Sequence, residues 1–122
     1  MKELIGVSCF LLMGLSLQGC GFSESNLGKL LETNACQKCY LSGADLKGEN
    51  LEGANLKGAN LTGADLTKTN LEGADLAGTN LTNTDLTNAT LEYARNFNTA
   101  DTTGAIFCRT IMPDGTKNKS GC

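Results

Sequence analysis

Leucine recurs every five residues through the middle of the chain, without a miss over eleven repeats. The series runs Leu41, Leu46, Leu51, Leu56, Leu61, Leu66, Leu71, Leu76, Leu81, Leu86 and Leu91. On an α-helix a step of five residues advances about 500°, so these leucines would form no stripe. On a flat strand an odd step would send alternate leucines to opposite faces. The pattern therefore predicts a chain that turns a corner in every pentad and winds into a coil with its leucines inside.

The residues around each leucine fit such a coil. The residue two places before it is small in every repeat except at Glu49, the residue before it is Asp or Asn in nine of the eleven, and Gly follows two places later in seven. Glycine tolerates backbone angles that tight corners need, and Asp or Asn side chains bond nearby backbone groups in turns. We expect Glu49 to turn outward or to lie near the open end of the coil. A ligand-binding role for its carboxylate is the alternative.

The register of the repeat shifts once, after Leu91. The next apolar centre is Phe97, six residues on, and the step of five then resumes through Thr102, Phe107 and Met112. One inserted residue around Arg95 and Asn96 would produce a bulge at one corner, with the coil continuing for one more turn. We expect Phe97 and Phe107 to join the eleven leucines in the core.

The motif A(D/N)LxG, repeated over residues 39–112, resembles the pentapeptide-repeat family. The resemblance implies an all-β solenoid, a right-handed quadrilateral β-helix with four repeats per coil, and about four to five coils in a chain of this length. Leu27, Leu30 and Leu31 lie three and four residues apart, which predicts a short amphipathic helix. We expect residues 27–38 to form this N-terminal capping helix and the lead-in to the repeats, and residues 113–122 to form a C-terminal closing loop.

The N-terminal twenty residues are typical of an export signal. Residues 4–17 are apolar apart from small residues, too short a run to span a membrane but suited to a signal peptide. The segment Leu17-Gln18-Gly19-Cys20 resembles a bacterial lipobox, which implies a signal at residues 1–19, a lipid on Cys20 and a tether over residues 20–26. We expect an exported protein, anchored in the membrane on the periplasmic side. Plain signal cleavage, and the lumen of an internal photosynthetic membrane as destination, are the alternatives.

Four cysteines remain once Cys9 is removed with the signal and Cys20 is assigned to lipid. They are Cys36, Cys39, Cys108 and Cys122. An even number in an exported chain suggests disulfides, for which three pairings exist. Pairing 36 with 39 and 108 with 122 is the most economical, because each pair lies at one end of the coil. A thioredoxin-like redox pair at Cys36 and Cys39 is an alternative, although the βαβ context of such pairs is missing. A zinc site is opposed by the separation of the two pairs.

The composition disfavours several classes of function. The chain has no His and no Trp, and its 10 Lys plus Arg against 13 Asp plus Glu give a net charge of −3. We therefore expect no catalytic residues, no cofactor, no metal, no small-molecule substrate and no nucleic acid. The residues after the leucines are mixed along the sequence, which predicts neither a hydrophobic stripe nor a field of one sign. The preferred hypothesis is a non-catalytic, membrane-tethered protein that presents a rigid surface to an unknown protein partner or has a structural role. The alternative is an acidic rod that imitates DNA and protects topoisomerases.

Overall fold

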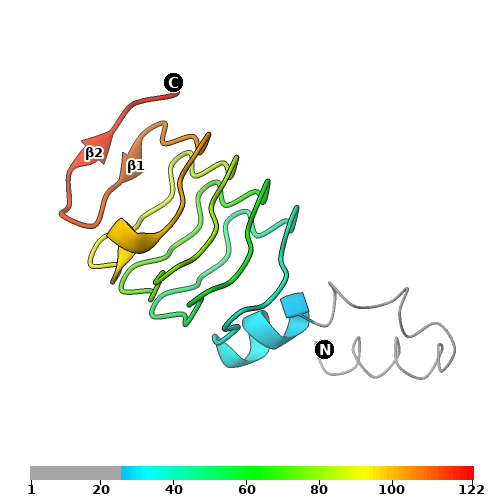
Figure 1. Ribbon diagram of the computed structural model, residues 1–122. Coiled ribbons are helices and arrows are strands. Elements are labelled where there is room, and N and C mark those ends of the chain that lie inside the picture. Colours follow the sequence, from blue (N-terminus) through cyan, green and yellow to red (C-terminus); the bar gives the residue numbers. More distant parts are fainter. Residues whose placement is uncertain (1–25) are drawn as a thin grey trace, which may run out of the picture.

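A computed structural model describes residues 26–122 of the chain (Figure 1). The predicted signal peptide and Cys20 lie outside the described residues. The described part contains a helix over residues 26–33, the 3₁₀ helix η1 (Phe97–Thr99) and the strands β1 (Thr110–Ile111) and β2 (Lys117–Asn118). Within residues 26–122 no helix has both the length and the apolar character that crossing a membrane requires. Asn26, which was expected to belong to the tether, is already helical.

The rest of the chain winds into stacked coils that are joined by parallel bridges between residues four pentads apart (Figure 1). The bridges begin with Ala35 and Asn55, so the coil starts earlier than the predicted boundary at residue 39. Backbone hydrogen bonds follow the ladder: the N–H of Leu46 donates to the carbonyl of Asp65 at 2.9 Å. Since each coil holds four pentads, it contains four corners, one in every repeat.

The extra residue of the last coil lies where the break in the leucine series predicts it. Asp75 still pairs with Arg95, four pentads on, but Asn80 pairs with Asp101, one residue further than four pentads. The chain turns here through Asn96, whose φ of 57° is left-handed, and forms η1 before it rejoins the ladder. The insertion is therefore absorbed at one corner, and the longer spacing persists up to the pair formed by Thr90 and Ile111.

Each corner is a tight turn that begins at the leucine. In one example the N–H of Ala54 donates to the carbonyl of Leu51 at 3.0 Å, and Gly53 between them has φ 69°. A positive φ at the third residue of a turn is the requirement of type II turns, and glycine meets it without strain. The side chain of Asn50 adds a bond, because its Oδ1 accepts from the N–H of Glu52 at 3.1 Å. Both expectations, glycine at the corners and Asp or Asn side chains bonded within the turns, are confirmed.

The core is a column of leucine side chains. All eleven leucines of the series are at most 1% exposed, and Leu30 of the N-terminal helix is completely buried against the same cluster. The small position two residues before each core centre holds buried threonines as well as alanines, and in the last coil this centre is Met112. The hydroxyl of each buried threonine donates to the carbonyl of a leucine in the preceding coil: Thr69 to Leu46, Thr79 to Leu56, Thr84 to Leu61 and Thr110 to Leu86. Burying these hydroxyls is tolerated because each has an acceptor.

The last coil differs from the expectation for Phe97 and Phe107. Both rings are half-buried and pack against the leucine cluster from its edge, 6.3 Å apart in an edge-to-face pair. The prediction that they belong to the buried core is wrong, because within residues 26–122 a coil packs against these rings from one side only. β2 pairs antiparallel with β1, Thr110 opposite Asn118, and so extends the final coil on one side only. The segment 113–122 is therefore a strand-containing turn-back rather than a plain loop.

Candidate interaction surface

Winding sorts the outward residues into columns that cannot be seen along the sequence. The residue after each leucine meets its counterpart four pentads later, or one residue further across the insertion. The resulting columns are Ser42, Thr62, Thr82 and Thr103; Lys47, Thr67 and Thr87; Glu52, Glu72 and Glu92; and Lys57 and Ala77. The prediction that no field of one sign exists is therefore wrong for one side, where three glutamates stack.

We call Glu52, Glu72 and Glu92 the glutamate column. The ladder fixes their spacing: the N–H of Gly53 donates to the carbonyl of Glu72 at 2.8 Å, and that of Gly73 to the carbonyl of Glu92 at 2.9 Å. Loss of water around the Glu72 carboxyl raises its pKa, and so do a hydrogen bond to Glu52 and the negative charges of Glu52 and Glu92. The column is a row of like charges that resists ionisation at its centre.

A second acidic row, the aspartate column, lies on the neighbouring side and consists of Asp45, Asp65 and Asp85. Parallel bridges join each of these residues to its neighbour in the next coil. The Thr67 hydroxyl donates to Asp65 at 2.7 Å and the Thr67 N–H at 3.0 Å, and Thr87 makes the same pair of bonds to Asp85. The Thr67 hydroxyl is the largest cause that lowers the pKa of Asp65, followed by the Thr67 N–H. Donors from the same turn thus stabilise the ionised form.

Two acidic residues outside these columns, Asp75 and Glu49, also lie on the surface of the coil. The pKa of Asp75 is lowered, first by the side chain of Asn96, whose Nδ2 donates to it at 3.1 Å, and then by the N–H of Ala77 and the charges of Arg95 and Lys57. The inserted residue of the last coil thus provides a partner for an acid in the coil before it. Glu49 is half-exposed and lies in the first coil, near the N-terminal end, as expected from its size and charge.

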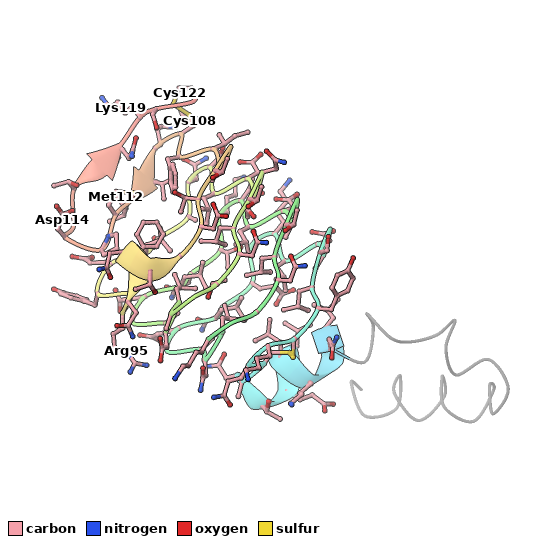
Figure 2. All side chains as sticks on the ribbon, viewed as in Figure 1. Arg95, Cys108, Met112, Asp114, Lys119 and Cys122 are labelled. Carbon is pink, nitrogen blue, oxygen red and sulfur yellow. A yellow bond between two sulfur atoms is a disulfide. The ribbon has the colours of Figure 1, made fainter. Side chains whose placement is uncertain are left out.

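The four cysteines form two disulfides, one at each end of the coil. Cys36 pairs with Cys39 next to the N-terminal helix, and Cys108 pairs with Cys122 at the other end, where Figure 2 labels both. The first is buried, with Cys36 fully covered and Cys39 7% exposed. The second joins Cys108, 8% exposed, to the exposed Cys122. With all four sulfurs bonded in pairs, this structure offers zinc no thiolate. In residues 26–122 no three His, Cys, Asp or Glu side chains converge as metal ligands would.

Sequence reasoning missed both the columns and the buried threonine bonds. The signal for the columns was present: reading the outward positions at a period of four pentads, rather than one, places the three glutamates in one row. The signal for the threonine bonds was weaker, because a threonine in the small position resembles any other small residue until its neighbour in the preceding coil is known.

Comparison with known proteins agrees with the repeat. The family model described as Pentapeptide repeats matches eight copies, over residues 36–73 and 69–107. No curated protein matches the chain. Among solved structures, it is similar to HetL from the cyanobacterium Nostoc sp. strain PCC 7120, a pentapeptide repeat protein involved in the regulation of heterocyst differentiation. The identity is 34% over 69% of this chain and 40% of HetL, with a TM-score of 0.45.

Two other solved structures are similar. A pentapeptide repeat protein from the thylakoid lumen of Arabidopsis thaliana is 36% identical over 66% of this chain and 59% of its own length, with a TM-score of 0.36. A second Nostoc pentapeptide repeat protein is 31% identical over 66% of this chain and 74% of its own, with a TM-score of 0.41. The chain thus spans less than two thirds of HetL and of the lumenal protein.

Proposed function

Because the chain belongs to the pentapeptide repeat family, we propose that it is a non-catalytic, exported and membrane-tethered protein that presents the side of a right-handed, four-sided β-helix to a protein partner. One observation carries the proposal: an unbroken ladder of parallel bridges joins the coils from Ala35 to Ile111. Every corner is fixed by a turn and every coil by its neighbours, so the outward side chains keep set positions. A surface that is ordered before binding loses little conformational entropy on association.

The glutamate column and the aspartate column offer a partner different chemistry. The carboxylates of Asp65 and Asp85 already accept bonds from Thr67 and Thr87. Glu72 has other glutamates beside it, so a basic group of a partner would relieve repulsion there. We therefore propose that the side bearing the glutamate column meets the partner. Tyr93, 69% exposed, follows Glu92 and adds aromatic contact area of the kind that interfaces favour.

Export and tethering rest on the sequence of the first twenty residues. The proposal expects a mature chain that begins at Cys20 and carries lipid there. Mass spectrometry of the mature N-terminus checks this directly: a diacylglyceryl cysteine supports the tether, and an unmodified terminus contradicts it. Recovery of the chain in the cytosol with residues 1–19 still attached would contradict export and favour the acidic DNA-mimic alternative.

Partner binding is tested by cross-linking the full chain in its native membrane and identifying the captured protein. The key variant is Glu52→Lys/Glu72→Lys, which reverses two charges of the glutamate column. Its matched control is Glu32→Lys/Asp45→Lys, which changes the net charge by the same amount at two exposed residues outside the glutamate column. The proposal predicts loss of the captured protein in the first variant and retention in the second. Equal capture by both variants would contradict the choice of side.

A further inference from the structure

The two disulfides differ in burial and in the length of chain that each one closes. Cys36 and Cys39 are three residues apart and buried beneath the N-terminal helix, within the hydrophobic cluster. Cys108 and Cys122 are 14 residues apart, and Cys122 is exposed. Figure 2 shows the second pair at the end of the coil farthest from that helix. A thiol reagent in solution reaches the second bond from the side of Cys122, while the first is covered.

Residues beyond β2 are attached to the coil mainly by this bond. The backbone of Asn118 is paired within the strand ladder, but the hydrogen bonds of the last residues are local: Ser120 N–H to Asn118 Oδ1 at 2.7 Å and Cys122 N–H to the Lys119 carbonyl at 3.3 Å. In contrast, the backbone of Cys108 is anchored independently, because its carbonyl accepts from Asn88 N–H at 2.9 Å. Opening the disulfide would therefore free the tail and leave Cys108 in place.

The tail passes closely over the final coil at Ile106 and Phe107. A Cβ added at Gly121 would lie 3.1 Å from Cγ2 of Ile106 and 3.6 Å from the backbone N of Phe107. In the inner coils the equivalent N–H groups donate to the next coil, as Leu86 does to Ile106. The described chain has no further coil for the N–H of Phe107, and residue 121 lies over it instead. The tail thus shields an open backbone edge, a feature that proteins usually cover because it can pair with other chains.

We propose that Cys108–Cys122 is a redox-operated clasp, which a dithiol opens in the folded protein while Cys36–Cys39 stays closed. One thiolate of the dithiol attacks Sγ of Cys122, the S–S bond breaks, and the Cys108 sulfur leaves as a thiolate that takes up a proton. The second thiol of the reagent then attacks the mixed disulfide and releases Cys122 as a thiol. The reagent ends as a disulfide, and two electrons have passed to the protein. Opening releases residues 119–122 and uncovers the edge at Ile106 and Phe107.

The test is a titration of the folded full chain with dithiothreitol, followed by alkylation of free thiols and peptide mapping, which reports each cysteine separately. Cys36–Cys39 serves as the internal control. We expect Cys108 and Cys122 to be alkylated at a dithiol concentration about tenfold lower than Cys36 and Cys39. Simultaneous opening of both bonds, or earlier opening of Cys36–Cys39, would overturn the proposal.

Hydrogen exchange tests the structural consequence. The variant Cys108→Ser/Cys122→Ser reproduces the open state without reductant. We expect faster amide exchange at Phe107 and over residues 119–122, both in the reduced wild-type chain and in this variant, with residues 41–91 unchanged. Unchanged exchange over residues 106–122 in both samples would show that the Cys108–Cys122 disulfide does not keep residues 119–122 in place over Ile106 and Phe107. Exchange that rises along the whole chain would show a general stabilising role instead, which also overturns the clasp.

Discussion

The aspartate column and the glutamate column are built by the same ladder, yet their carboxyl groups respond to it in opposite directions. The pKa of Asp65 is lowered and that of Glu72 is raised. The difference comes from the place of each carboxyl relative to its leucine. Asp65 precedes its leucine, where its short side chain reaches the N–H and hydroxyl of Thr67. Glu72 follows its leucine, and its own N–H is given to Asn70 Oδ1 at 2.9 Å.

A solenoid places equivalent residues of successive coils next to one another, even when they carry the same charge. Stacked carboxylates therefore depend on hydrogen-bond donors within their own turns. In the aspartate column, the carboxylates of Asp65 and Asp85 have donors within their own pentads. In the glutamate column, the groups that act on the Glu72 carboxyl are the carboxyls of Glu52 and Glu92, which raise its pKa. The same backbone geometry thus produces one side whose carboxylates have hydrogen-bond donors within the protein. It produces a second side whose carboxylates a basic partner would stabilise. The following predictions test this contrast, beginning with changes that affect both sides alike.

The largest effects are expected from the core that both columns share. Leu66 lies beneath the aspartate column and Leu71 beneath the glutamate column, and both are completely buried. Replacing either by Ala should lower the free energy of unfolding by about 3 kcal/mol, through lost transfer energy and the cavity left behind. Urea unfolding of Leu66→Ala and Leu71→Ala measures this, with the exposed Lys57→Ala as control. Losses that differ by more than about 1 kcal/mol between the two leucines would mean that the two sides are held differently.

Removing one donor should make the aspartate column resemble the glutamate column. Thr67→Val keeps the shape of the side chain but removes the hydroxyl that donates to Asp65. We expect a loss of about 1 kcal/mol at pH 7, typical of one hydrogen bond, and an upward shift of the Asp65 pKa. Thermal unfolding and NMR titration measure the two effects. Thr62→Val is the matched control, because the residue at the corresponding place in its turn is the uncharged Asn60.

The corners beside the two columns should respond to opposite substitutions. Gly73 and Lys68 both have left-handed backbones, with φ of 69° and 61°. A side chain in this region costs about 1–2 kcal/mol, which the greater unfolded-state freedom of glycine offsets in part. Gly73→Ala should therefore lower stability by about 0.5 kcal/mol, and Lys68→Gly should raise it by a similar amount. Urea midpoints report both changes, and a stabilising Gly73→Ala would contradict the assignment of these corners.

The smallest effect concerns pH. Because the pKa of Glu72 is raised on folding, its contribution to stability is present below its unfolded value of 4.5 and is lost as pH rises through the folded pKa. Asp65 behaves oppositely: its contribution is present above 3.8 and is lost as pH falls through the lowered folded pKa. Glu72→Gln should therefore raise the urea midpoint at pH 7 and leave it unchanged near pH 4. A gain that persists at pH 4, or that salt does not reduce, would contradict repulsion as the cause.

Much of the coil could be predicted from local sequence. The leucine period, the glycine at seven of the eleven corners and the Asp or Asn before nine of the eleven leucines report interactions within one pentad. The break after Leu91 marks the insertion at Asn96. The exposure of Phe97 and Phe107 could not be predicted from the same period, because burial at a centre depends on a coil lying on both sides. The sequence pattern is the same in the middle and at the end of the rod.

The candidate surface was less predictable for a related reason. Its columns arise from contacts between successive coils, and the buried hydroxyl of Thr79 bonds to Leu56 in the preceding coil. Such contacts depend on the number of pentads per coil, which a five-residue motif does not state. The disulfide partners follow from the ends of the coil, but the shielding of Phe107 by Gly121 depends on how the tail turns back through β2.

The most direct test of the account is the spacing of through-space contacts in solution. Nuclear Overhauser spectra of the full chain should connect backbone protons four pentads apart from Ala35 onward, for instance Asp45 with Asp65 and Asn50 with Asn70. Beyond Asn96 the spacing should grow by one residue, as between Asp85 and Ile106. Contacts at three and four residues throughout the repeats, or a spacing that does not change at the insertion, would contradict the coil and both columns built upon it.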